Sequence, residues 1–328
     1  MEIVFYAKGF PPREYGGPVV AGFHLLREFL LDRRVHITLI TQTACKEEEI
    51  HRSLGRPGNL TVIRLPYYVS FHDIRTLRQV AGVIWGADLV HFNAFPFRHL
   101  LYLLLAKLGG IPTVYRLGGL LSAEAETTLG PAYPLRILVS RGRLSVRFPR
   151  WFIRFLLAVY RRSASLWNAV IANSEALKRQ AVKAEGFDQS RIWVIPNAVE
   201  LPKYLPAPPG SHGGPTRLLF VGKLEPVKGP DLLLASLGRL AKKHSVDLSI
   251  VGTGSLEGSL RNQAEELGQH NITFHGSLYR EELTRLYAWT DIVVVPSRYE
   301  SFPLVVLEAM AARRPLVVTA VGGVPEIV

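Results

Sequence analysis

The sequence predicts an α/β protein made of two doubly wound domains, and three observations lead to this prediction. Short apolar runs rich in Val, Ile and Leu alternate with longer amphipathic stretches, which is typical of parallel strands covered by helices on both faces. The alternation occurs twice, and a segment dense in Pro and Gly separates the two series. The length of 328 residues suits about two domains of ordinary size.

The individual strands are predicted from near-continuous apolar runs, because a parallel strand is buried on both faces. Seven such runs fall in the first series and five in the second, and helical stretches separate most of them, for example at 17–33 and 97–108. The predicted strands are EIVFYA from Glu2, HITLIT from His36, LTVIRL from Leu60, LVHFN from Leu89, TVYRL from Thr113, AVIAN from Ala169, RIWVIP from Arg191, RLLFVG from Arg217, LSIVG from Leu248, ITFHG from Ile272, DIVVVPS from Asp291 and PLVVTA from Pro315.

The two series define the expected domains. We expect an amino-terminal domain over residues 1–200, a linker over 201–214 and a carboxyl-terminal domain over 215–328. Ligands of doubly wound domains bind at the carboxyl ends of the strands, so the site is expected there. With five strands and four helices, the second domain is expected to be truncated at its carboxyl-terminal end; the alternative is an unusually small domain.

Composition excludes several classes of protein. Apolar residues make up 48% and charged residues 20%, which excludes a disordered chain, a collagen or a disulfide scaffold. The single cysteine, Cys45, cannot form an internal disulfide. The amino terminus reaches Lys8 after five apolar residues, too few for a signal-peptide core, and no run approaches the ~20 apolar residues that span a bilayer. We therefore expect a cytoplasmic protein whose membrane contact, if any, is peripheral on the inner face.

Charge is distributed unevenly between the halves. Residues 1–164 carry 22 basic and 11 acidic side chains, whereas residues 165–328 carry 17 and 16, and the whole chain has a net charge of +12. A basic half predicts an anionic partner: nucleic acid, a membrane surface or a phosphorylated substrate.

The basic excess centres on a window without acidic residues between Glu126 and Glu175. Within it, residues 141–162 interleave arginines with Trp and Phe, a pattern that fits an interfacial segment on anionic lipid. A packed helix with a solvated basic face is an equal alternative. A nucleic-acid-binding stripe also fits the pattern, but the expected anion site lies at strand ends and not on the stripe, so no nucleic acid is expected as partner.

Two carboxylates mark the most informative segment, DIVVVPSRYESFPLVVLEAMAARRPLVV. A buried strand ends at Pro296, and a helix is predicted to begin at about Pro303. Glu308 lies in the middle of this apolar helix with no basic residue three or four positions away, and a buried carboxylate without a partner costs several kcal/mol. Ligand hydroxyls would satisfy it, while the helix amino terminus after Glu300 would bind an anion. The alternative is a solvated Glu300 and a Glu308 paired with a distant arginine.

A second constellation follows the first strand of the second series. Gly222, Lys223 and Lys228 lie at a strand end and in the loop after it, where glycine admits a close ligand and two ammonium groups can neutralise a diphosphate. The alternative is a pair of ordinary surface lysines. A weaker signal is Gly16 and Gly17 before a predicted helix, which suggests exposed N–H groups. The segment GTGSLEGSL has the spacing G-x-G-x-x-x-G, which argues against a dinucleotide site.

Taken in order and spacing, these motifs resemble the family 4 glycosyltransferases, retaining enzymes of the GT-B architecture with two Rossmann-like domains. The resemblance covers almost the whole chain. It is carried by the glycine pair, DLVHFN, NAVIANSEALK, IPNAVE, FVGKLEPVKG, IVGTGSLEGSL, ITFHGSL, the pattern of two glutamates separated by seven residues, and VGGVPEIV.

The resemblance implies roles for the candidate residues. As catalytic residues it implies Glu300 on the transferred sugar, with Lys228 and Lys223 on the donor diphosphate. It also implies that Glu308 takes the ribose hydroxyls and that Gly17 completes the phosphate cradle from the other domain. The full donor-binding set is Gly17, Gly222, Lys223, Lys228, Glu300, Ser301, Phe302, Pro303, Leu304 and Glu308, and the acceptor-side set is Gly16, Asn93 and Arg116.

The chain departs from the family at three positions. Lys223 stands where Arg is common. Phe302 is followed by Pro303 where Phe-Gly is frequent, which removes one N–H donor from the cradle. Gly118 occupies a position where many members have His or Arg, and Arg116 is the nearest substitute.

The resemblance therefore implies a hexosyltransferase that uses a UDP-, GDP- or ADP-sugar and a membrane-proximal glycan or polyprenyl-linked acceptor, in polysaccharide or glycolipid synthesis. It implies no cofactor and no metal, and the chain has no Asp-x-Asp motif. The alternative is a truncated, inactive relative that keeps only a glycan-binding or scaffolding role.

Overall fold

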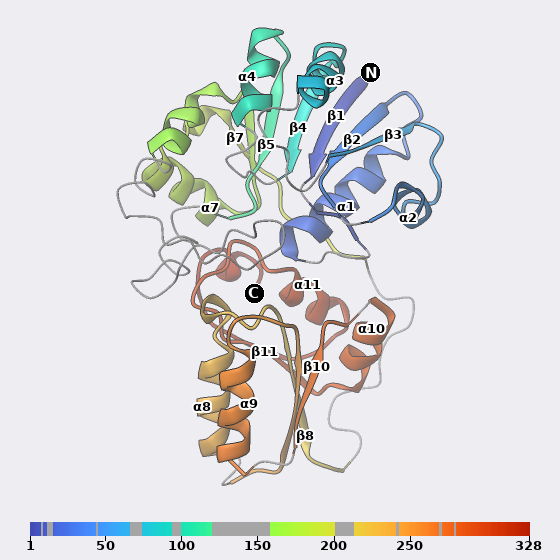
Figure 1. The fold of residues 1–328 in the computed structure, drawn as a ribbon. Helices are drawn as coiled ribbons and strands as arrows, with labels where there is room; N and C mark the ends of the chain where they lie inside the picture. Colours follow the sequence, from blue (N-terminus) through green and yellow to red (C-terminus); the bar gives the residue numbers. More distant parts are fainter. Residues whose placement is uncertain are drawn as a thin grey trace. The chain divides into compact units, whose positions relative to one another are not determined.

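The structure is a computed structural model that describes residues 1–7, 9–11, 16–43, 45–65, 74–93, 100–119, 158–200, 213–240, 243–268, 271–278 and 280–328. The described residues form two compact units, which divide between Pro196 and Asn197 (Figure 1). Most of the predicted linker, 201–212, and most of the basic segment, 141–157, lie outside the described residues.

Unit 1 contains a seven-stranded parallel sheet in the order β3-β2-β1-β4-β5-β6-β7. The strand order reverses between β1 and β4, as in doubly wound folds, and the register pairs Glu2 with His36 and Ile3 with Leu89. The strands are β1 (Glu2–Ala7), β2 (His36–Thr41), β3 (Leu60–Arg64), β4 (Leu89–Asn93), β5 (Thr113–Arg116), β6 (Ala169–Ala172) and β7 (Ile192–Val194).

The described helices of unit 1 connect these strands. A π-helical turn, Ala181–Glu185, continues the last of the helices, and residues 158–163 are also helical. The remaining helices are α1 (Gly17–Phe29), α2 (Glu47–Ser53), α3 (Ile74–Trp85), α4 (Leu100–Leu108) and α7 (Glu175–Gln180).

Unit 2 contains a five-stranded parallel sheet in the order β10-β9-β8-β11-β12. Its elements alternate along the chain as in unit 1. They are β8 (Thr216–Val221), α8 (Pro230–Leu240), β9 (Val246–Val251), α9 (Glu257–Glu266), β10 (Ile272–Gly276), α10 (Arg280–Trp289), β11 (Ile292–Val295), α11 (Leu304–Ala311) and β12 (Leu316–Val318).

Each face of the unit 2 sheet has its own core. Leu218 and Phe220 point to one face, where they pack with α8 and α9, which lie side by side in Figure 1. Leu219 points to the other face and packs with α10 and α11, including Tyr287 and Val306. Because successive residues of a strand face opposite sides, one strand supplies both cores. The predicted doubly wound α/β fold is therefore confirmed, as are all twelve predicted strands.

None of the helices that the structure describes is both long and apolar enough to cross a bilayer.

Candidate functional site

The loops that follow β8, β9, β11 and β12 meet at one edge of the unit 2 sheet, because parallel strands end at the same edge. Glycines let these loops pack backbone against backbone. A Cβ on Gly252, where φ is 134°, would overlap the carbonyl oxygen of Gly222. A Cβ on Gly322, where φ is 54°, would overlap the carbonyl oxygen of Glu300. Gly252, the first glycine of the segment that resembles a dinucleotide fingerprint, therefore allows close packing of the backbone against Gly222.

Glu300 lies buried at the centre of this edge. Its Oε1 accepts hydrogen bonds from Lys228 Nζ at 2.7 Å and from Ser297 Oγ at 2.8 Å. The Glu300 side chain is 7% exposed and that of Lys228 is 30% exposed. The alternative of a solvated Glu300 is thus wrong, because the loop folds inward onto a lysine 72 residues away. The Lys228 stem also passes 3.9 Å from the Cβ position of Gly222.

Arg298 fixes the turn that carries Lys228. Its guanidinium donates two hydrogen bonds to the Asp231 carboxylate, at 2.8 and 2.6 Å, and one to the Pro226 carbonyl at 2.5 Å. The Asp231 carboxyl has a lowered pKa because Arg298 donates to it. On the other side, Thr319 Oγ1 donates to the Ser297 carbonyl at 2.5 Å. The Lys228 turn and the Glu300 loop are therefore held from both sides.

Glu308 lies on α11 and is partly buried. Its Oε2 accepts a hydrogen bond from the Tyr287 hydroxyl at 2.8 Å. Burial raises the pKa of the Glu308 carboxyl, and the Tyr287 hydrogen bond opposes that rise. Burial and the neighbouring Glu308 also raise the pKa of Tyr287 well above its ordinary value. Among the described residues, the partner of the Glu308 carboxylate is therefore the neutral Tyr287 hydroxyl on α10, and not the arginine of the sequence alternative.

The start of α11 differs from the prediction by one position. Pro303 has an extended ψ of 124° and is the N-cap, so Leu304 is the first helical residue. The missing N–H of Pro303 consequently lies before the helix, and the N–H groups at its start have no acceptor within the helix. Asn197 Nδ2 donates to the Phe302 carbonyl at 3.0 Å and holds this segment in place. Phe302 and Leu304 are buried, whereas Ser301 is partly buried.

The structure brings together some predicted residues and not others. Gly222, Lys228 and Glu300 form one cluster. Lys223 is exposed at the end of β8 and makes no ion pair with a described residue. Sequence reasoning gave no role to four residues that hold these side chains: Asn197, Ser297, Arg298 and Tyr287. Asn197 lies within the motif IPNAVE, and Ser297 and Arg298 lie within the segment that begins at Asp291. Ser297 contacts Glu300 three residues away, whereas the partners of Asn197, Arg298 and Tyr287 are remote in sequence.

The unit 1 candidates form a separate network at the ends of β4 and β5. Arg116 Nη1 donates to Asn93 Oδ1 at 3.0 Å, and Asn93 Nδ2 donates to the Pro18 carbonyl in the first turn of α1, also at 3.0 Å. A Cβ on Gly22 would collide with the Asn93 side chain. Burial lowers the pKa of Arg116 to about 10. Arg116 and Asn93 therefore fix the first turn of α1.

Gly16 is the N-cap of α1 and Gly17 is its first residue. Among the described residues, no heavy atom lies within 4 Å of a Cβ built on either glycine. Local packing therefore does not require glycine at these two positions.

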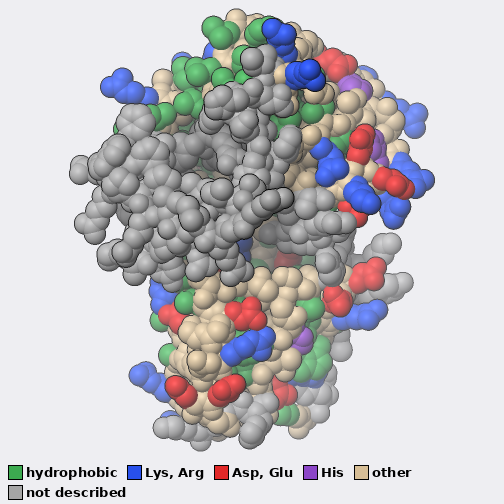
Figure 2. All heavy atoms as spheres, in the orientation of Figure 1, with side chains coloured by type: hydrophobic (Ala, Val, Ile, Leu, Met, Phe, Trp, Pro, Cys, Tyr) green, Lys and Arg blue, Asp and Glu red, His purple; other side chains and the backbone are tan. Residues whose placement is uncertain are grey.

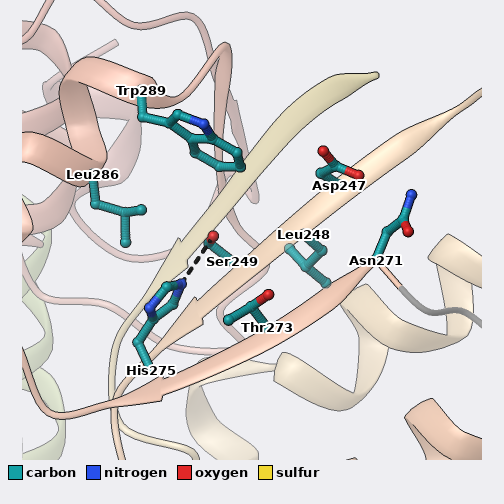
Figure 3. Close-up of a pocket in the computed structure, with 8 residues that line it drawn as sticks. All are labelled: Asp247, Leu248, Ser249, Asn271, Thr273, His275, Leu286 and Trp289. Carbon is teal, nitrogen blue, oxygen red and sulfur yellow. Dashed lines mark hydrogen bonds between the residues drawn. The ribbon is translucent and has the colours of Figure 1, made fainter. Parts of the chain in front are cut away.

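A pocket of about 390 Å³ lies elsewhere in unit 2, on the face of β9 and β10 beside α10 (Figure 3). His275 Nε2 and Ser249 Oγ lie 3.1 Å apart at its wall. None of the predicted site residues lines it. Within the described ranges, no three or more His, Cys, Asp or Glu side chains are grouped so that they could hold a metal ion, and the expected absence of a metal stays a prediction.

Two family models together match nearly the whole chain. The model described as Glycosyltransferase Family 4 matches residues 15–203, and the model described as Glycosyl transferases group 1 matches residues 205–328. These matches cover the described residues of unit 2 and the part of unit 1 from α1 onward, and they include the loops that carry the Glu300 cluster.

Curated relatives share part of their length with this chain. A D-inositol 3-phosphate glycosyltransferase of Segniliparus rotundus is 29% identical over 80% of this chain and 57% of the relative. An uncharacterized glycosyltransferase of Methanocaldococcus jannaschii is 40% identical over 34% of this chain and 29% of the relative. The chain thus spans about half, or less, of these relatives.

Solved structures share the fold. Anabaena HepE in complex with UDP and glucose matches with a TM-score of 0.72 at 19% identity, over 99% of this chain and 82% of that one. WaaG, a glycosyltransferase involved in lipopolysaccharide biosynthesis, matches with a TM-score of 0.66 at 19% identity, over 99% and 83% of the two chains.

The backbone packing at the strand ends predicts the effect of one methyl group. Gly252→Ala should lower the free energy of unfolding by about 3 kcal/mol or more, because it combines an unfavourable φ with a backbone overlap. Urea denaturation measures the change. The matched control is Gly258→Ala in α9, where an added Cβ meets nothing within 4 Å. This substitution should raise the free energy of unfolding by about 0.5–1 kcal/mol. Equal effects of the two variants would contradict the packing.

The buried ion pair predicts a partial rescue. Lys228→Met should destabilise the protein by about 2–3 kcal/mol, because it leaves the buried Glu300 carboxylate without its cation. Adding Glu300→Gln should recover at least half of the loss in the same urea measurement. The control is Arg261→Met, which breaks an exposed pair with Glu257 and should change stability by about 0.5 kcal/mol or less. No recovery in the double variant would argue against the pair.

Proposed function

Because the chain belongs to glycosyltransferase family 4, we propose that it transfers a hexose from a nucleotide diphosphate sugar to an acceptor hydroxyl. The observation that carries this proposal is the buried Lys228–Glu300 pair. It lies at the carboxyl edge of the unit 2 sheet, where doubly wound domains bind their ligands. Both residues lie within the segment 205–328, which matches the group 1 glycosyltransferase model.

The donor would lie along this edge. Lys228 and the exposed Lys223 would neutralise the diphosphate, with the N–H groups at the start of α11 as further donors. An ammonium group has three N–H donors, so Lys228 can contact phosphate while one N–H stays on Glu300. Glu300 would contact the transferred sugar, and Glu308 would accept from the ribose hydroxyls. The UDP bound to the structural relative HepE favours UDP as the nucleotide, with GDP and ADP as alternatives.

The reaction we propose retains the configuration at the sugar carbon. The bond from that carbon to the diphosphate breaks, the acceptor oxygen bonds to the carbon on the same face, and the departing diphosphate takes the acceptor proton. Negative charge grows on the leaving diphosphate, where Lys228 and the α11 amino terminus would stabilise it. No step of this reaction uses a metal.

Unit 1 would supply the acceptor side. Asn93 and Arg116 hold the first turn of α1, so Gly16 and Gly17 would keep their N–H groups in a fixed place. No described heavy atom lies within 4 Å of the Cβ positions of these glycines. Their N–H groups would therefore be open to a sugar or a phosphate.

We further propose that the acceptor is a glycan or a polyprenyl-linked sugar at an anionic membrane surface. The predicted basic segment 141–162 carries exposed Arg161 and Arg162 in its described part. Hydrophobic side chains also gather at the α3 and α4 end of unit 1, near Lys and Arg (Figure 2). Trp85 is 54% exposed and Leu108 is 81% exposed there. Exposed Trp and Leu beside cations suit the interface of an anionic bilayer.

Transfer should depend on one lysine. Lys228→Ala should reduce transfer at least 100-fold, since it removes the main cation beside the leaving group. A screen with UDP-, GDP- and ADP-sugars measures release of the nucleoside diphosphate. The control is Lys243→Ala, an exposed lysine that follows α8, close before β9 begins. Near-normal turnover in Lys228→Ala, or no turnover of any donor by the unaltered protein, would contradict the proposal.

Membrane contact should depend on an exposed leucine. Leu108→Glu should weaken co-sedimentation with anionic vesicles at least threefold, because it places an anion on the apolar surface. The control is Leu232→Glu on α8, which is exposed on the other unit. Equal vesicle binding by the two variants would contradict the proposed membrane contact. Binding of the unaltered protein to a DNA or RNA duplex, and not to vesicles, across a salt series would also contradict it.

A further inference from the structure

Tyr287 connects α10 to the glutamate on α11. Its ring lies in the apolar core of unit 2 with Val293, Val306 and Ala309, and the residue is 5% exposed. From this position its hydroxyl reaches across to Glu308 and donates to Oε2 at 2.8 Å. The tyrosine is therefore held by packing at one end and by a charge-assisted hydrogen bond at the other.

This hydrogen bond fixes which oxygen of Glu308 is available. The terminal torsion of a glutamate side chain is soft, so an untethered carboxylate turns easily. Tyr287 holds Oε2, and no described residue donates a recorded hydrogen bond to Oε1. One carboxylate oxygen is thus occupied and oriented, while the other keeps its two lone pairs for a ligand.

The same hydrogen bond favours the ionised form of the carboxylate. Burial raises the pKa of Glu308, and the hydrogen bond from the Tyr287 hydroxyl offsets part of that rise. Tyr287 stays protonated because its own pKa is raised well above the ordinary value. An ionised, oriented carboxylate is a strong acceptor for the two neighbouring hydroxyls of a ribose.

We propose that Tyr287 is a positioning residue that makes the site select ribose over 2′-deoxyribose by orienting Glu308. The proposal rests on the proposed function, which places a nucleotide at this edge of unit 2. Both ribose hydroxyls donate to Oε1, and a 2′-deoxyribose loses one of these bonds. A site built to pair with a substrate hydroxyl discriminates strongly against an analogue that lacks it.

The test compares two ligands and three proteins by calorimetry. The ligands are whichever of UDP, GDP and ADP binds best and its 2′-deoxy counterpart. The proteins are the unaltered chain, Tyr287→Phe, and the control Leu283→Ala, which removes α10 packing against the same core. The unaltered chain should prefer the ribonucleotide about tenfold or more. Tyr287→Phe should lower this ratio at least threefold, mainly by weakening the ribonucleotide, and the control should leave it unchanged.

The outcomes separate this inference from the proposed function. A Tyr287→Phe protein that folds and keeps the ratio, or that weakens both ligands equally, overturns the positioning role and leaves the proposed function standing. An unaltered chain that binds nucleotides without preferring ribose also overturns the positioning role and leaves the proposed function standing. An unaltered chain that binds no nucleotide overturns both.

A second variant decides the matter if Tyr287→Phe does not fold. In Glu308→Gln, Tyr287 would donate to the amide oxygen and leave the NH₂ group in the place of Oε1. The ribose preference should then fall at least threefold, because the ribose hydroxyls lose their acceptor. If Tyr287 does not orient this side chain, the amide turns its oxygen to the ribose and keeps the preference, which overturns the proposal.

Discussion

A buried carboxylate, Glu300, is the constraint on which the organisation of unit 2 depends. A carboxylate in the interior is stable only with a cation and further donors, so Lys228 and Ser297 must reach it. That requirement brings the loop after β8 against the loop after β11. Glycines then permit the remaining loops to pack backbone against backbone at the same edge, as Gly322 does against Glu300. The first turn of α11 begins directly after the Glu300 loop that is packed in this way.

Two carboxylates on one segment have different environments and therefore suit different ligands. Glu300 is paired with a cation, so its charge is largely compensated before a ligand arrives. Glu308 is paired with the neutral hydroxyl of Tyr287, so its charge remains available. The start of α11 lies between them and favours an anion. A sugar, a diphosphate and a ribose match this sequence of environments in order.

Local patterns were sufficient to predict the strands and to single out Lys228, Glu300 and Glu308, but not the contacts of these side chains. Each strand is a continuous apolar run, which burial on both faces dictates, and glutamates near a helix start are legible from spacing alone. The Lys228–Glu300 pair joins residues 72 positions apart and the Tyr287–Glu308 pair joins residues 21 apart, so tertiary folding alone reveals them. Pro303 was placed inside α11 from its preference for the first turn, whereas its extended ψ makes it the cap.

The central claim is that the carboxyl edge of the unit 2 sheet binds a nucleoside diphosphate between Lys228 and Glu308. A crystal structure of the protein with bound UDP tests it most directly. The account predicts the diphosphate within hydrogen-bonding distance of Lys228 Nζ and of an N–H at the start of α11, with a ribose hydroxyl on Glu308 Oε1. UDP bound elsewhere, for example in the pocket lined by His275 and Trp289, with the Lys228 edge empty, would contradict it.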